Sequence, residues 1–97
     1  MNYRNDVTDC LMDTLLRFEN REDLYRFFED ACTVKELLDI AQRLQVARML
    51  DEKRSYAAIT KETGMSTATI SRVNRCLMYG SGGYRMAIDG MKKEPKA

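Results

Sequence analysis

Residues 55–79, with the sequence SYAAITKETGMSTATISRVNRCLMY, decide the fold because they contain two short helical segments separated by a glycine. Ser55 is a good N-cap for a first helix over residues 56–63, and Gly64 can adopt the left-handed backbone that ends it. Ser66 then caps a second helix. The stretch therefore predicts a helix-turn-helix.

The second of these helices has one apolar and one polar face. Ile70, Val73 and Leu77 recur at helical spacing and predict the buried side. The opposite side carries short or hydroxylated residues followed by arginines, which suits insertion into the major groove of DNA. Basic residues before and within the first helix can add contacts with phosphates. The residues that we expect to contact DNA are Ser66, Thr67, Ala68, Thr69, Ser71, Arg72, Arg75, Lys61, Lys53 and Arg54.

A plain helical hairpin in a bundle would show the same caps and the same glycine. Three features favour DNA binding instead: the spacing from Gly64 to Ile70 and Val73, the short side chains on the outward face, and the local basic charge. Thr60 departs from the usual motif, in which Ala or Gly faces the turn. We therefore expect a slightly more open turn.

Length and composition narrow the class of protein. A chain of 97 residues forms one domain. It contains no transmembrane run and its polar N-terminus does not resemble a signal peptide, so we expect a cytoplasmic protein with no membrane partner. The three cysteines are widely spaced and lie in helical patterns, and histidine is absent. This predicts reduced, buried thiols and no metal site.

The formal charge of +1 conceals an asymmetry along the chain. Residues 1–51 contain 7 basic and 11 acidic residues, a net charge of −4, whereas residues 52–97 contain 9 basic and 4 acidic residues, a net charge of +5. Phosphates would repel the first part and attract the second. The charge distribution is thus suited to orienting the molecule on DNA.

Three amphipathic helices are predicted before the central motif. The first carries an apolar stripe from Val7 to Phe18 and ends near Glu19, and the second follows an Asn20 cap. A capping box at residues 33–36 opens the third and longest helix, which runs to about residue 51. Its apolar residues cover more than one stripe. A second copy of the protein is the obvious source of cover, so we expect a homodimer.

The chain after the central motif predicts one more helix. Residues 80–83 break the preceding helix, and the apolar residues from Tyr84 to Met91 give a short last helix with an inner face. Residues 92–97 are charged and contain the only proline, so we expect a disordered tail. The predicted fold class is all-α with about six helices, in a single domain over residues 1–91.

The order of three scaffold helices, a helix-turn-helix and a closing helix resembles the Trp repressor family, more closely its YerC/YecD-type relatives in Gram-positive bacteria. The resemblance covers about residues 5–91. Its most specific part is ATISR at residues 68–72, which is similar to ATITR in the repressor, supported by Thr33 and Arg43. The resemblance implies an intertwined homodimer that places two recognition helices in successive major grooves. It also implies regulation of transcription, with repression as the expected mode.

The resemblance also implies a position for a small-molecule corepressor. In the Trp repressor, a threonine, two arginines, a glycine and a serine hold tryptophan. Thr33, Arg43 and Arg72 match the threonine and the arginines, but Val73 replaces the glycine and Cys76 replaces the serine. An indole would meet an isopropyl group and lose a hydroxyl partner, so we expect no dependence on tryptophan. The candidate ligand pocket is therefore Thr33, Arg43, Arg72, Val73 and Cys76, with its ligand left open.

The sequence bears on two other classes of function. A helical protein-interaction adaptor is the alternative to a DNA-binding regulator, and it predicts no salt-sensitive affinity for duplex DNA. An enzyme is not expected, because the chain lacks histidine, a phosphate-binding glycine loop after a strand, and paired carboxylates outside ordinary helix faces. No cofactor is expected either.

Overall fold

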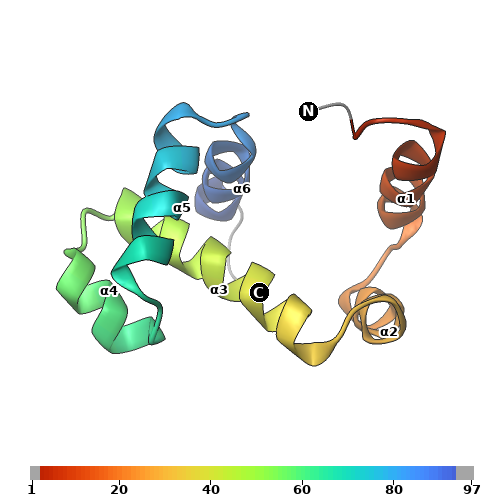
Figure 1. Ribbon diagram of the computed structural model, residues 1–97. Coiled ribbons are helices and arrows are strands. Elements are labelled where there is room, and N and C mark those ends of the chain that lie inside the picture. The colour runs from red at the N-terminus through yellow and green to blue at the C-terminus, as the bar shows by residue number, and fades with distance from the viewer. Residues whose placement is uncertain (1–2, 94–97) are drawn as a thin grey trace. The chain divides into compact units, whose positions relative to one another are not determined.

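The computed structural model describes residues 3–93 and consists of α-helices joined by short turns (Figure 1). No strand occurs within these residues, which confirms the predicted all-α class with about six helices. The helices are α1 (Asp6–Arg17), α2 (Arg21–Ala31), α3 (Val34–Asp51), α4 (Tyr56–Thr63), α5 (Thr67–Tyr79) and α6 (Gly83–Lys93).

Two helix ends differ from the sequence-based bounds. Helix α1 ends at Arg17, two residues before the expected end near Glu19. Helix α6 continues to Lys93, so the first two residues of the expected tail are helical. The rest of that tail, residues 94–97, lies outside the described residues.

Side-chain caps set where the helices begin. Asn20 accepts a hydrogen bond from the Asp23 amide at 2.9 Å, as predicted. The capping box at α3 is also confirmed: the Glu36 amide donates to the Thr33 hydroxyl at 3.1 Å, and the Thr33 amide donates to the Glu36 carboxylate at 2.8 Å. These bonds from Thr33 lower the pKa of Glu36 below its ordinary value. Asn5 caps α1 in the same way, a feature that the sequence analysis missed.

The chain divides into two compact units, the N-terminal unit (residues 1–37) and the C-terminal unit (residues 38–97). In the N-terminal unit, the rings of Phe18 and Phe27 pack with their centroids 5.7 Å apart. No side chain within residues 3–37 is buried, and Val7 and Leu16 are 78% and 82% exposed. The start of the α1 stripe is thus open to solvent, whereas Leu24, Phe27 and Phe28 of α2 are half-buried.

The C-terminal unit contains all the fully buried side chains of the described residues. Helices α4, α5 and α6 gather around the C-terminal half of α3 (Figure 1). Each of these helices contributes at least one aliphatic side chain to the core, and Met65 and Leu77 pack against its rim. The core residues are Val46, Ala47, Met49, Ile59, Ile70, Val73 and Ile88.

Ion pairs join the first and last helices of the C-terminal unit. Asp51, the last residue of α3, accepts a bond from Arg85 at 2.9 Å and another from Lys92 at 2.8 Å. The hydrogen bonds from Lys92 and Arg85 lower the pKa of the Asp51 carboxyl. Both basic residues lie on α6, so the end of α3 is fastened to α6 beside the core.

Candidate nucleic-acid interface

The helix-turn-helix forms as the sequence predicts. Ser55 accepts a hydrogen bond from the Ala58 amide at 3.1 Å and starts α4, and Gly64, with φ of 75°, ends it. Ser66 accepts from the Thr69 amide at 3.2 Å and starts α5. The turn between them thus has the glycine and the cap that a tight change of direction requires.

Helix α5 is divided between a buried and an exposed face. Ile70 and Val73 are 0% and 2% exposed and belong to the core. Thr67, Ala68 and Ser71 are exposed, together with the two arginines that follow them. The buried face fixes the helix on the C-terminal unit, so the opposite face presents short side chains first and guanidinium groups next.

The residues expected to contact DNA are mostly accessible. Nine of the ten are exposed, and Thr69 alone is half-buried. Thr69 also accepts a bond from the Ser66 hydroxyl at 3.1 Å. The hydroxyls of Ser66 and Thr69 therefore serve the start of α5, which leaves Thr67 and Ser71 as the freer hydroxyls on this face.

The basic residues around the motif differ in whether they have a partner. Arg54 lies 3.6 Å from Glu62 in an exposed ion pair. Four other basic residues of the motif and of the turn before it are exposed and form no ion pair within the described part of the chain: Lys53, Lys61, Arg72 and Arg75. These four charges are available to an anionic ligand such as the DNA backbone.

Lys53 has an unusual backbone. Its φ of 65° lies in the left-handed region, and it is the one residue other than glycine within residues 3–93 with a positive φ. The Lys53 and Arg54 amides donate to the carbonyls of Leu50 and Met49 at 3.0 and 3.1 Å, so α3 ends in a Schellman motif. Glycine normally occupies the left-handed position of that motif, and here a lysine does.

Thr60 has an unsatisfied hydroxyl in α4. Its Oγ1 atom is buried and has no hydrogen-bond partner, whereas the neighbouring Thr63 hydroxyl donates to the Ile59 carbonyl at 2.7 Å and accepts from the Met65 amide at 3.1 Å. Ala or Gly at this position would leave no such polar group buried. The departure noted in the sequence is therefore a real polar defect inside the motif.

The candidate ligand-pocket residues are only partly brought together. Arg72 and Cys76 line one surface hollow of about 450 Å³, together with Arg75, Tyr79 and Gly80. Val73 lies in the core beneath them and does not line that hollow. Arg43 is half-buried on α3 of the same unit, and Thr33 belongs to the N-terminal unit, where its hydroxyl caps α3.

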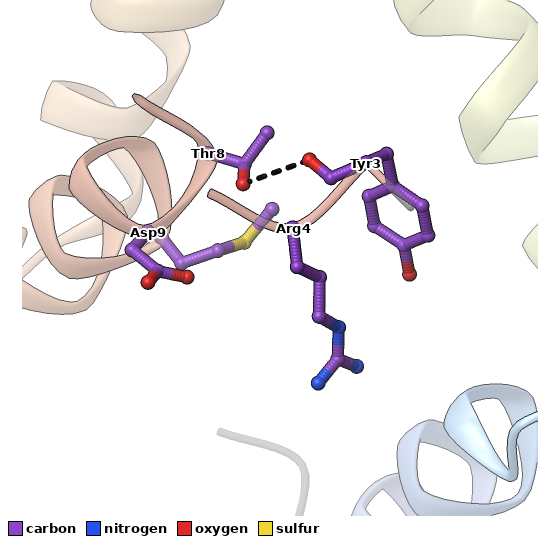
Figure 2. A pocket seen from close by; sticks show the side chains of 5 residues that line it. Tyr3, Arg4, Thr8 and Asp9 are labelled. Carbon is purple, nitrogen blue, oxygen red and sulfur yellow. Dashed lines mark hydrogen bonds between the residues drawn. The ribbon is translucent and has the colours of Figure 1, made fainter. Parts of the chain in front are cut away.

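Another hollow lies beside the N-terminal arm, residues 3–5 before α1, and contains none of the expected site residues. Figure 2 shows the Thr8 hydroxyl donating to the Tyr3 carbonyl at 3.1 Å, which ties the arm to α1. Asp9 and Arg4 border the same hollow of about 310 Å³. Each is an exposed charged residue, and the residues described around this hollow do not form a recognisable catalytic or ligand-binding arrangement.

The cysteines correct one expectation. The three thiols are free, but Cys10 and Cys76 are exposed and Cys32 is half-buried, whereas the sequence analysis expected buried thiols. Cys76 lies outside the Ile70 and Val73 stripe, and Cys10 lies in a unit without buried side chains. Within residues 3–93 no cluster of potential metal ligands occurs. None of the helices there is both long and apolar enough to cross a membrane.

Comparisons with known proteins cover nearly the whole chain. Residues 7–92 match the family model described as Trp repressor protein. The chain is 51% identical over 90 residues to the uncharacterized protein YerC of Bacillus subtilis (strain 168), across 93% of this chain and 86% of that protein. A candidate Trp repressor from Staphylococcus aureus superposes with a TM-score of 0.88 at 48% identity, covering 96% of this chain and 93% of that one. A TrpR like protein from Eubacterium eligens ATCC 27750 gives a TM-score of 0.89 at 42% identity and covers 96% of each chain.

Proposed function

Because the chain belongs to the Trp repressor family, we propose that it is a sequence-specific DNA-binding transcriptional regulator and that it acts as a repressor. Helix α5 enters the major groove, and Ser71 and Arg72 contact base edges. Lys53 and Lys61 contact phosphates on either side. The relatives are bacterial proteins, and in bacteria the chromosome lies in the cytoplasm, so we expect the protein there.

One observation carries this proposal: the outward face of α5 and its surroundings have charges without protein partners. A solvated helix of a bundle usually balances its arginines with nearby carboxylates. Here Arg72 and Arg75 have no such partner within the described residues, and the residues before them on α5 are too short to obstruct a close approach to bases. This arrangement supports a polyanionic ligand for α5.

The exposed apolar residues support a homodimer as the active form. Val34, Leu38 and Ile40 on α3 are 76%, 53% and 52% exposed, and the stripe of α1 is open as well. Large apolar side chains left exposed on a helix mark a candidate surface for contact with another protein molecule. A second copy would cover this surface and present two α5 helices to one DNA duplex.

A gel shift with mixed genomic DNA fragments at two salt concentrations tests the proposed function. We expect binding that weakens steeply as salt rises, because each phosphate contact releases counterions. Selection of bound fragments from a random DNA pool would then yield the preferred site. The absence of salt-sensitive binding to duplex DNA would overturn the proposal and favour a protein-interaction adaptor.

A further inference from the structure

Asp51 is the point where α3 and α6 are held together by charge. Its Oδ1 atom lies 2.9 Å from Arg85, its Oδ2 atom lies 2.8 Å from Lys92, and its side chain is only 14% exposed. Arg85 is also 3.7 Å from Asp89 on its own helix. Both carboxylate oxygens of Asp51 are therefore engaged with α6, across 34 and 41 residues of chain.

The positions of these charges on their own helices are unfavourable. Asp51 is at the C-terminus of α3, where the helix dipole disfavours negative charge. Arg85 is the third residue of α6, where the dipole disfavours positive charge. Arg85 has only the longer ion pair with Asp89 on its own helix, at 3.7 Å, and its shorter contact is with Asp51, at 2.9 Å. Their role is therefore between helices.

Fastening α6 to α3 has a consequence for α5. The chain leaves α3 directly after Asp51, forms α4 and α5, and returns with α6, which packs on α5 through the shared core. The ion pairs thus close a ring of helices that contains the helix-turn-helix. We propose that Asp51 is a positioning residue for DNA binding, which fixes α5 in its DNA-competent orientation through Arg85 and Lys92.

This inference rests on the proposed function, and the substitution Asp51→Asn tests it. Removing a negative charge beside a DNA-binding surface should by itself strengthen binding, because repulsion of phosphate falls. Glu52→Gln is the matched control: it makes the same charge change at the next residue, which is exposed and has no ion pair among the described residues. We expect Glu52→Gln to maintain or raise the DNA affinity and Asp51→Asn to lower it by about fivefold.

The salt dependence separates positioning from a lost phosphate contact. Asp51→Asn should leave the slope of log affinity against log salt unchanged, whereas loss of one phosphate contact reduces it by about one unit. Asp51→Glu keeps the charge and should recover part of the affinity. All affinities are measured below the unfolding transition of each variant, followed by circular dichroism. If Asp51→Asn does not fold, Arg85→Met takes its place. This variant should also lower the DNA affinity and leave the salt slope unchanged, because α5 keeps all its contacts with DNA.

The outcomes distinguish this inference from the proposed function. If the unsubstituted protein shows no salt-sensitive DNA binding, the proposed function fails. If the unsubstituted protein binds DNA but Asp51→Asn behaves as Glu52→Gln does, the proposed function stands and the positioning role is overturned. A lower affinity for Asp51→Asn and Arg85→Met, with partial rescue by Asp51→Glu, supports the positioning role.

Discussion

The two units of this chain are built from the same kind of amphipathic helix, but only one of them has a core. Within residues 38–93 seven side chains are buried, whereas none is buried within residues 3–37. Helix α1 has a clear apolar stripe, and its Leu11 is still 40% exposed. Periodicity therefore identifies which face of a helix is apolar, and the packing partners decide whether that face is covered.

The units also differ in charge. Residues 1–37 contain 5 basic and 9 acidic residues, a net charge of −4, and residues 38–97 contain 11 basic and 6 acidic residues, a net charge of +5. Exposed apolar side chains occur in both units, for example Val7 and Leu11 in the acidic unit and Leu38 and Ile40 in the basic unit, but among the described residues only the basic unit has a core and the helix-turn-helix. The difference in charge fits the proposed function, in which the basic unit binds DNA and the exposed residues of the acidic unit contribute to the dimer.

The largest expected effect is on the stability of the C-terminal unit. Ile70→Ala removes a fully buried side chain and should lower the free energy of unfolding by about 2–5 kcal/mol. Leu11→Asp in the N-terminal unit removes an exposed leucine, so it should leave the helices intact while destabilising the dimer. Circular dichroism in urea measures the first effect, and equilibrium sedimentation measures the second.

A dimer whose unfolding midpoint rises with protein concentration would support a role of the N-terminal unit in assembly. If the unsubstituted protein sediments as a well-folded monomer at micromolar concentration, the exposed apolar residues have another role and the proposed contribution of the N-terminal unit to assembly is wrong.

The second prediction contrasts arginines of the two units. Arg72→Ala should weaken binding to the preferred DNA site by about 1–3 kcal/mol if its guanidinium reads a base. Lys61→Ala should weaken binding to all sequences equally and reduce the salt slope by about one unit. Arg17→Ala, the same change in the N-terminal unit, should leave both quantities nearly unchanged. Gel shifts on specific and scrambled DNA measure these effects, and an equal loss on both DNAs would reassign Arg72 to the phosphate backbone.

Local signals in the sequence predicted most of the fold. The caps Asn20, Ser55 and Ser66, the capping box of α3 and the stop at Gly64 are short-range features, so their positions could be read from neighbouring residues. The exposed face of α5 followed from helical spacing in the same way.

Features that depend on contacts distant in sequence were missed. The ion pairs of Asp51 with Arg85 and Lys92 join residues far apart in the chain. The sequence pattern that could have predicted these ion pairs is an acidic residue at the C-terminus of one helix and a basic residue near the N-terminus of another. This pattern indicates an ion pair only when the two helices are known to meet. The exposure of Cys76 was missed because a residue at the edge of an apolar stripe can face either way.

The third prediction concerns the strained corner before α4. Lys53→Gly should raise the free energy of unfolding by about 1 kcal/mol, because a left-handed backbone is costly for a residue with a side chain and not for glycine. Glu52→Gly, at the neighbouring position, should lower it by a similar amount. Loss of the Lys53 ammonium should weaken DNA binding at the same time. Parallel urea denaturation and gel shifts test this: an unchanged or higher DNA affinity would contradict the proposed phosphate contact, and an unchanged or lower stability would contradict the strain at Lys53.

The smallest expected effect is that of tryptophan, which we expect to change neither DNA affinity nor stability. A ligand shifts an equilibrium only through a difference in its affinity for two states. Val73, in place of the glycine of the Trp repressor, is 2% exposed in the core. The residues that match the repressor's ligand set are divided between the units, with Thr33 in the N-terminal unit and Arg43 and Arg72 in the C-terminal unit.

Calorimetry and gel shifts with and without L-tryptophan test this independence. Val73→Gly is a demanding variant, since it removes a core side chain and places glycine inside α5, at a cost of about 2–4 kcal/mol. It must therefore be assayed well below its unfolding transition. A response to tryptophan created by Val73→Gly in an otherwise unresponsive protein would show that the valine excludes the ligand. An isotherm of millimolar or better affinity in the unsubstituted protein, with a large gain in DNA binding, would refute the prediction and make the two units jointly responsible for a ligand site.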